Sequence, residues 1–477
     1  MSPNKAVVPV VLFLLVSFFA NAESAKFWSS DSYVGDLSIY LNHSNWKLLN
    51  LDTKSQKTWF VGQTYESFVT PLLLNERDMI FGIVSPQFLG ELAANKKIEN
   101  LDSYFEKMDK QKKEKFLSDI FPAYLNSYMK YENSIYGLPI DGDALVLHYR
   151  PSYFKDANLR KKFKLKYKKE LKVPETWEEY DQTAEFFTEN LESKGVYGNY
   201  LFNIDPWVWT FWYARLAPLQ LELFDENMSP LINNEIVKKT LRDYLKLARF
   251  SHPGVEDLSG GAAVKEWSKK QIVMTIWWSD LSELSSSLNK DSAEDIAVAP
   301  LPGVKNKFGK IIRHGQIPYG RVIVIPSYLD EKTKNTVFNE LFELVSSPKA
   351  IDFLANPKTG LDPYLISQFD DKKSYLQSSI KNKSNLNTME CVDNLLNVSK
   401  EEINNAIPQP NWPGSYRYFN FLGRSIRQIL MKETDIETAV TNIESEWKKI
   451  RNELGEKEQI KHWQNYRQLL LNTVEKK

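Results

Sequence analysis

Two aspartates separated by one glycine, Asp141 and Asp143, form an acidic pair whose setting suggests binding chemistry. Residues 137–139 (Gly-Leu-Pro) favour an extended approach, and Gly142 permits an unusual backbone conformation between the acids. The apolar run 144–147 that follows has the length of a buried strand. The pattern predicts a polar pair presented at a strand end, but acids beside a strand are also common as solvated turn residues.

Tryptophan is the second residue type whose placement indicates binding. The chain has 13 Trp residues, and aromatic faces are what a carbohydrate-binding protein needs to stack on sugar rings. Trp209 and Trp212 are three residues apart, so they share one helical face. One or two rings of their cluster are expected to lie in the core, and the resemblance described below implies that at least one faces a ligand cleft. Asp280 follows an apolar run and could accept hydrogen bonds from hydroxyls. The aromatic candidates are Trp207, Trp209, Trp212, Trp278 and Trp412.

The sequence contains no recognisable catalytic constellation. The five histidines are scattered, with no H-E-x-x-H pair, and there is no phosphate loop, no dinucleotide-binding glycine motif and no G-x-S-x-G elbow. We therefore expect no catalytic residue, no metal and no cofactor. Because glycosidases need only two carboxylates brought together in space, a carbohydrate-active enzyme remains an alternative.

Composition limits the class of protein further. The 61 basic and 61 acidic residues balance, which argues against nucleic acid as a partner, and 477 residues are enough for two or three domains. The single cysteine, Cys391, excludes an intramolecular disulfide and a cysteine-based zinc site.

The N-terminus has the features of a signal peptide over residues 1–22. Lys5 precedes an apolar run from Ala6 to Ala20, and Ala20-Asn21-Ala22 has the small-x-small form of a cleavage site. The run is short for a bilayer span, which needs roughly 20 residues. No cysteine lies near the cleavage point, so the sequence predicts an exported protein without a lipid anchor, compatible with the periplasm.

One strand–helix passage places a further candidate. Residues 79–84 form an apolar strand, Ser85 is a good N-cap, and Pro86 is a good first helical residue. Ligands of open α/β sheets lie at the carboxyl ends of strands and face helix N-termini, so Ser85 is a candidate ligand contact. Further along, Thr176 and Glu179 predict a capping box. Thr434 and Glu437 predict the cap of a closing helix, whose apolar stripe has the spacing of a packed helix: Ile436, Ala439, Val440, Ile443, Trp447, Ile450 and Leu454.

An ordered series of motifs from about residue 78 to 450 resembles the family 1 extracellular solute-binding proteins, the periplasmic sugar receptors of ABC transporters. These motifs are GELAANKKIENLDSY at 90–104, YGLPIDGDALVLHYR at 136–150, VPETWEEY at 173–180, Leu223-Phe224-Asp225, Val273-Met274 with Trp278 and Asp280, IAVAPLPG at 296–303, and TGLDPYLISQ at 359–368. The chain departs from the family pattern where Leu216–Leu221 replaces a Gly-Gly, and where Tyr319-Gly320-Arg321 replaces a Gly-Gly-Trp.

The resemblance implies a two-lobed α/β fold of the type II periplasmic binding proteins, hinged around a central cleft. It implies a first lobe of residues 23–143 and 301–346, and a second lobe of residues 144–300 and 347–477. A loop after the first strand lines the cleft in this family, so His43 and Trp46 become candidates, and Tyr319 becomes a substitute stacking ring.

The function that the resemblance implies is capture of a sugar or oligosaccharide by a monomeric receptor, which delivers it to an inner-membrane ABC permease. Two other classes stay open: an orphan sensor or accessory module that kept the fold without the transporter, and the carbohydrate-active enzyme. The sequence does not name the sugar.

Overall fold

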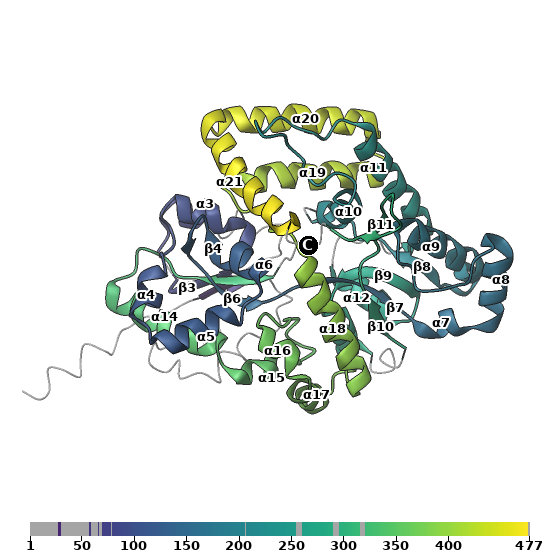
Figure 1. Ribbon diagram of the computed structural model, residues 1–477, viewed down its shortest axis with the longest axis horizontal. Helices are drawn as coiled ribbons and strands as arrows, with labels where there is room; N and C mark the ends of the chain where they lie inside the picture. The colour runs from purple at the N-terminus through teal and green to yellow at the C-terminus, as the bar shows by residue number, and fades with distance from the viewer. Residues whose placement is uncertain are drawn as a thin grey trace, which may run out of the picture.

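Two β-sheets form the framework of the molecule in the computed structural model, which describes residues 27–29, 57–58, 65, 69–77, 79–205, 207–253, 260–289, 295–314 and 320–475. The first sheet has the order β2-β1-β3-β13-β6, and the second has the order β10-β7-β9-β8. In Figure 1, β3 and β6 lie on the left, and β7, β9 and β10 lie on the right. The strands are β1 (Phe27–Ser29), β2 (Lys57–Thr58), β3 (Phe81–Val84), β6 (Leu138–Asp141), β7 (Leu145–Tyr149), β8 (Tyr197–Tyr200), β9 (Ile272–Trp278), β10 (Ala297–Ala299) and β13 (Arg321–Val324), with two separate hairpins, β4 (Lys130–Tyr131) with β5 (Ser134–Ile135), and β11 (Val304–Lys305) with β12 (Ile311–Ile312).

The first sheet is mixed. β1 runs parallel to β2 and β3, whereas β13 lies antiparallel between β3 and β6. All four residues of β3 are buried, as expected of a continuous apolar strand with both faces covered. The helices near this sheet include α2 (Thr70–Leu73), α3 (Leu89–Ala94), α4 (Asp102–Lys107), α5 (Lys110–Ser118), α6 (Pro122–Tyr124) and α14 (Glu331–Val345).

The second sheet is built around β7 and β9, which pair antiparallel over five residues, while β8 runs parallel to β9. Its helices are α7 (Pro151–Lys155), α8 (Ala157–Tyr167), α9 (Trp177–Leu191), α10 (Val208–Leu216), α11 (Glu235–Leu247), α12 (Gly260–Ser268) and α13 (Leu281–Leu288). α9 begins after Thr176 as predicted, because the Thr176 hydroxyl oxygen accepts a hydrogen bond from the Glu179 N–H at 3.2 Å. The second bond of the predicted capping box is shifted by one residue: the Glu179 carboxylate accepts from the Glu175 N–H at 3.0 Å instead of the Thr176 N–H.

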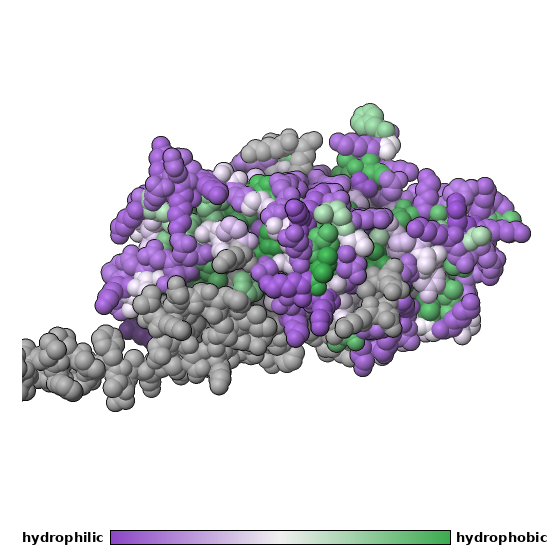
Figure 2. All heavy atoms as spheres, turned by 90° about the horizontal axis from the view of Figure 1, so that it is seen from below, coloured by the Kyte–Doolittle hydropathy of each residue, from purple (hydrophilic) through white to green (hydrophobic). Residues whose placement is uncertain are grey.

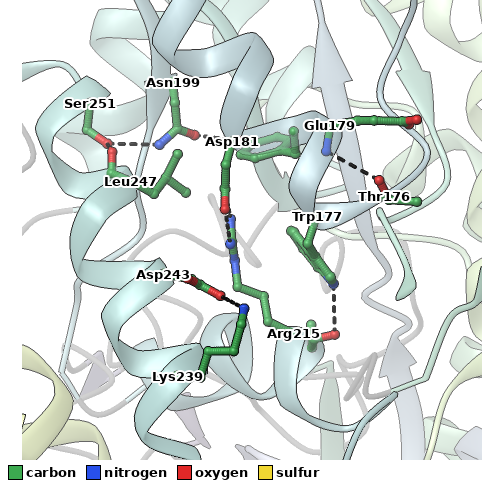
Figure 3. Close-up of polar contacts among 12 residues, drawn as sticks. Thr176, Trp177, Glu179, Asp181, Asn199, Arg215, Lys239, Asp243, Leu247 and Ser251 are labelled. Atoms are coloured by element: carbon green, nitrogen blue, oxygen red, sulfur yellow. Dashed lines mark hydrogen bonds and ion pairs between the residues drawn. The ribbon is translucent and has the colours of Figure 1, made fainter. Parts of the chain in front are cut away.

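A buried guanidinium ties α9 to α10 inside this second half (Figure 3). Arg215 donates two hydrogen bonds to Asp181, at 3.0 and 2.8 Å, and its guanidinium lies 4.4 Å from the Trp177 ring centroid. The Trp177 indole N–H in turn donates to the Ala214 carbonyl at 3.2 Å. These contacts satisfy the charge inside the core, so the helices that support β8 and β9 are held in one arrangement.

The two sheets are joined by a very short connection. β6 ends at Asp141 and β7 begins at Leu145, so only three residues lie between them. A second connection leads from β10 of the second sheet to β13 of the first. The chain segment that contains Asp362 lies beside the β6–β7 connection, because the Gly142 N–H donates to the Asp362 carbonyl at 3.1 Å.

Residues 348–405 form a group of helices below the sheets in Figure 1. The helices are α15 (Ile351–Leu354), α16 (Ile366–Asp370), α17 (Lys372–Lys381) and α18 (Met389–Asn405). Although the sequence assigned this segment to the second lobe, its buried residues from Ile351 to Ile403 belong to the same hydrophobic cluster as Phe81 and Ile323 of the first sheet. α18 also contacts β7 and β10 of the second sheet.

Three C-terminal helices cover the upper side of the molecule in Figure 1: α19 (Ser415–Leu430), α20 (Ile436–Glu453) and α21 (Glu456–Glu475). The stripe predicted for α20 is buried at Ala439, Val440, Ile443, Trp447 and Ile450. Its N-cap is Asp435, which accepts from the Thr438 N–H at 2.9 Å, and not Thr434 as the S/T-x-x-E spacing suggested.

The helical layer also touches the first half of the molecule. The Gly414 N–H donates to the Glu91 carboxylate at 2.7 Å, and the Tyr416 ring packs against Phe88 at 5.2 Å between centroids. On the face shown in Figure 2, hydrophilic residues predominate and hydrophobic ones form small separate groups. No helix in the described part of the chain is both long enough and apolar enough to cross a membrane.

Candidate functional site

The connection between the two sheets carries the first of the predicted acids. Asp141 is fully buried; its Oδ1 accepts a hydrogen bond from the Asp362 N–H at 2.7 Å, and its Oδ2 forms an ion pair with the Arg321 guanidinium. Arg321 is brought there by strand pairing, since it is the residue opposite Asp141 between β13 and β6. The acid and the base are thus placed by backbone register, and both oxygens of Asp141 are engaged.

Asp143 lies beside the same guanidinium. Its carboxylate is 3.7 Å from the Arg321 Nη1, and the residue is 4% exposed. The Tyr124 hydroxyl donates to the carbonyls of Gly142 and Asp143, which fixes the backbone of the connection. Burial and then the neighbouring Asp141 charge raise the pKa of Asp143, and Arg321 lowers it only in part.

Two further carboxyls join this pair from distant parts of the chain. Carboxylate oxygens of Asp141, Asp143 and Asp362 all lie within 4.8 Å of one another, a spacing at which three carboxylates could hold a cation. Burial, followed by the Asp143 charge, raises the pKa of Asp280; burial, followed by the Asp280 charge, raises that of Asp362. The Asp280 Oδ1 and the Asp362 Oδ2 are buried and accept no hydrogen bond from any residue in the described part of the chain.

Glu283 extends the acidic group into α13. It is 3% exposed, accepts a hydrogen bond from the Tyr375 hydroxyl at 3.2 Å, and burial raises its pKa to about 8. We refer to Asp141, Asp143, Asp280, Asp362 and Glu283 as the acidic cluster. At neutral pH such a cluster cannot be fully ionised without a compensating positive charge, because each buried carboxylate has lost its hydration.

Trp278 lies at the end of β9, two residues before Asp280, and is partly exposed. Its ring meets those of Phe202, Phe211 and Trp207 at 5.4, 5.4 and 5.7 Å between centroids. Its carbonyl is 2.8 Å from the Nε2 of the buried His148, which fixes the strand end. Trp207 is also partly exposed, so two partly exposed rings lie side by side at the end of β9.

The other predicted tryptophans lie deeper. Trp209 is 2% exposed and stacks on Phe419 at 4.4 Å between centroids, and Trp212 is completely buried. Trp412 is 2% exposed and packs against aromatic residues of α19 and α21. In this conformation the three rings belong to the core that joins the second sheet to the C-terminal helices.

Ser85 ends β3 as predicted and precedes a turn of 3₁₀ helix, Pro86–Phe88, but its hydroxyl makes no capping hydrogen bond. It is 6% exposed, and its Oγ has no partner. Gln87 and Gln409, which the sequence did not single out, also have buried amide atoms without partners. The one clue to Gln409 in the sequence was its position three residues before the candidate Trp412, in the same Pro/Gly loop.

The sequence reasoning also did not select Arg321, Asp362 and Glu283. Arg321 and Asp362 lie in motifs that it quoted, Tyr319-Gly320-Arg321 and TGLDPYLISQ, whereas Glu283 lies in none of them. The candidates His43, Trp46 and Tyr319 lie outside the described residues.

Comparisons with known proteins agree with this architecture. The family model of the bacterial extracellular solute-binding proteins matches residues 75–356, more than half of the chain. A solute-binding protein of an ABC transporter from Agrobacterium radiobacter K84, solved with ribitol, has a TM-score of 0.72 at 18% identity, covering 90% of this chain and 98% of that one. A search of curated proteins gave no match.

Two other solved structures have similar scores. One is a solute-binding protein of an ABC transporter from Thermotoga lettingae TMO bound to α-D-tagatose, with a TM-score of 0.68, 16% identity, and coverage of 90% of this chain and 100% of that one. The other is maltose-bound MalE3 of T. maritima, with a TM-score of 0.66, 19% identity, and coverage of 89% and 99%. These likenesses confirm the predicted type II periplasmic binding fold, and the family match shows that the chain belongs to the bacterial extracellular solute-binding proteins.

Proposed function

We propose that this protein is a periplasmic receptor that captures a sugar or sugar derivative between its two halves and delivers it to the permease of an ABC transporter. The observation that supports this most is the acidic cluster at the connection between the sheets, next to the partly exposed Trp278. Carboxylates for hydroxyl groups and an aromatic face for the ring are the two kinds of contact that a saccharide requires. The solved relatives bound to ribitol, α-D-tagatose and maltose are consistent with that ligand class.

The cluster draws on segments that can move relative to one another. Arg321 belongs to the first sheet, Asp280 follows β9 of the second, and Asp143 lies in the connection between them. A ligand that contacts all three makes its full set of contacts only in the closed arrangement, so binding favours closure. We assign ring stacking to Trp278 and Trp207, and hydroxyl recognition to Asp141, Asp143 and Asp280. Roles for Trp209, Trp212, Trp412, Ser85, His43, Trp46 and Tyr319 remain predictions.

Binding can be tested by thermal unfolding of the protein with monosaccharides, oligosaccharides and polyols. A ligand that binds only the folded state adds about 2.7 kcal/mol of stability at one hundred times its Kd. We expect at least one saccharide to raise the melting temperature in a concentration-dependent way. A screen in which no saccharide or polyol raises it would contradict the proposal and favour the orphan module.

The site itself is tested by isothermal titration calorimetry with the saccharide found in that screen. Trp278→Ala should weaken its affinity at least about tenfold, because the stacking face is removed. Phe308→Ala is the matched control, since Phe308 is an aromatic ring in the β11–β12 hairpin that is 81% exposed. Unchanged affinity in Trp278→Ala would show that the saccharide does not stack on this ring.

A further inference from the structure

The acidic cluster has an unbalanced charge. It contains five buried or nearly buried carboxyls, and the cation that pairs with it among the described residues is Arg321. That guanidinium is already committed to Asp141 and lies 3.7 Å from Asp143. Asp280, Asp362 and Glu283 form no ion pair with any described cation, and the Arg321 charge only partly offsets the rise in the Asp280 pKa.

Asp362 supplies an independent indication of a ligand. It reaches the cluster from a turn outside both sheets, and it is 1% exposed. Its carboxyl interacts with the Asp143 carboxyl and with the Ser279 side chain, but its Oδ2 has no hydrogen-bond partner among the described residues. A carboxylate oxygen of Asp362 lies within 4.8 Å of oxygens of Asp141 and Asp143, so the side chain points toward the pair. The Oδ1 of Asp280, which follows the second sheet, is also without a donor. Buried acceptors of this kind are costly unless a donor arrives.

We propose that the natural ligand is a saccharide that carries an ammonium group, an amino sugar, and that the ammonium is received by Asp280, Asp362 and Asp143. This inference rests on the proposed function and adds the charge of the ligand to it. An ammonium group is a compact cation with three N–H donors, so it can serve three carboxylates that converge on one region. The rest of the sugar ring would lie toward Trp278, where a cation near an aromatic face is favourable as well.

A divalent metal ion fits these contacts less well. Both oxygens of Asp141 are engaged, one by the Asp362 N–H and the other by Arg321. A metal ion between the carboxylates would therefore lie close to a guanidinium that already neutralises part of the cluster, and the two positive charges would repel one another. An ammonium needs only the acceptors that are left.

The proposal predicts a measurable release of protons on binding, because the free protein holds protons on the acidic cluster. Burial raises the pKa of Asp143, Asp280 and Asp362, so in the absence of a cation the cluster retains protons. Besides Arg321, the other titratable groups around the cluster are Tyr124, Tyr128, Tyr375 and the buried His148. They add no positive charge, because burial lowers the His148 pKa to about 4. An arriving ammonium favours the ionised carboxylates, so these protons are released to the buffer.

The test is isothermal titration calorimetry of the full chain with glucosamine, galactosamine and the glucosamine disaccharide, each compared with its neutral N-acetyl form. The titrations are done near pH 6.5, about one unit below the pKa of an ordinary α-amino group, in phosphate and in imidazole buffer. We expect an amino form to bind at least about tenfold more tightly than its neutral form. Its apparent enthalpy should differ between the two buffers by an amount that corresponds to proton release.

Two variants separate the charge effect from folding. Asp280→Asn keeps the size of the side chain and removes the charge that faces the ammonium. Because Asp280 is also assigned to the sugar hydroxyls, both forms should bind more weakly, and the amino form should lose at least about tenfold more affinity than the neutral form. Asp243→Asn is the control, because Asp243 is paired with Lys239 on the surface helix α11, outside the cluster. The buffer dependence of the unmodified protein tests the inference even if a variant fails to fold.

Each contrary result has a distinct meaning. Neutral sugars that bind as tightly as amino sugars, without proton release, would overturn the charged ligand and leave the proposed receptor function intact. Stabilisation by calcium chloride alone would replace the ammonium with a metal site. Stabilisation by spermidine but by no saccharide, or by none of these compounds, would contradict the receptor function together with the inference.

Discussion

The individual carboxyl groups of the acidic cluster differ in the hydrogen bonds and the positive charge that their surroundings provide. Asp141 receives a backbone N–H and a guanidinium, whereas Glu283 receives only the Tyr375 hydroxyl. Burial removes hydration from both, but only Asp141 has a positive charge beside it. Removing the Asp141 charge should therefore lower the stability of the protein. Removing the Glu283 carboxyl should instead reduce the loss of stability that occurs as the pH rises.

Glu283→Gln should change how stability depends on pH. Because burial raises the Glu283 pKa from 4.5 to about 8, the folded state holds a proton that the unfolded state loses in this interval. Stability of the unmodified protein therefore falls as the pH rises from about 4.5 to 8, by up to about 1.4 kcal/mol per unit from this group. Urea unfolding at pH 5 and at pH 8 should show a smaller fall for Glu283→Gln. An equal fall in both proteins would exclude Glu283 as its source.

Asp141→Asn should destabilise the protein by about 3 kcal/mol, because it leaves the Arg321 charge without its main partner inside the protein. Asp370→Asn is a suitable comparison, since it removes a carboxylate from an exposed pair with Lys400 and should cost less than about 1 kcal/mol. Urea unfolding at neutral pH measures both. Similar losses in the free energy of unfolding would mean that the buried ion pair stabilises the protein no more than a surface ion pair does.

At the level of elements, the close approach of two segments decides the geometry of the connection. A Cβ atom on Gly142 would lie 2.1 Å from the Pro363 carbonyl oxygen, and the Gly142 N–H is bonded to the Asp362 carbonyl. Glycine is required here because backbone meets backbone, which leaves no space for a side chain. The same contact keeps the Asp362 carboxyl next to Asp141.

Gly142→Ala should therefore separate the turn at 360–364 from the connection. We expect a loss of about 2 kcal/mol or more in the free energy of unfolding, together with weaker ligand binding, since the backbone must shift. Gly309→Asn is the control: it lies in an exposed hairpin with a φ of 79° and open space around it, and Asn tolerates that conformation. Normal stability and affinity in Gly142→Ala would show that the turn can move without consequence.

On the scale of the whole molecule, the cluster connects parts that would move in hinge closure. The segments that meet there come from both sheets and from the 360–364 turn, while Glu91 and Gly414 link the first half to the helical layer. A ligand between the halves stabilises the arrangement in which these groups are close. The proposed receptor function therefore predicts a change of shape on binding.

Small-angle X-ray scattering should detect that change. With a saturating saccharide, the radius of gyration of the protein should decrease, and Trp278→Ala at the same saccharide concentration should show a smaller decrease. An unchanged radius despite calorimetric binding would indicate that the ligand enters a molecule that is already closed.

The sequence by itself determined the local features of this protein. The helix cap at Thr176, the apolar stripe of α20 and the strand–helix passage after residue 79 all depend on neighbours within a few residues. Hydrophobic period and capping chemistry act over this short range, so they can be read directly. The position of Asp141 and Asp143 beside a buried strand was predicted for the same reason.

Only the tertiary structure decided which distant groups meet. Arg321 is 180 residues from Asp141, and Asp362 is 221 residues from it, yet both contact its carboxylate. The sequence also could not show that Trp209, Trp212 and Trp412 lie in a core formed with the C-terminal helices. A periodic pattern shows that a side chain turns away from water, but whether it meets a ligand or another helix depends on how the whole chain packs.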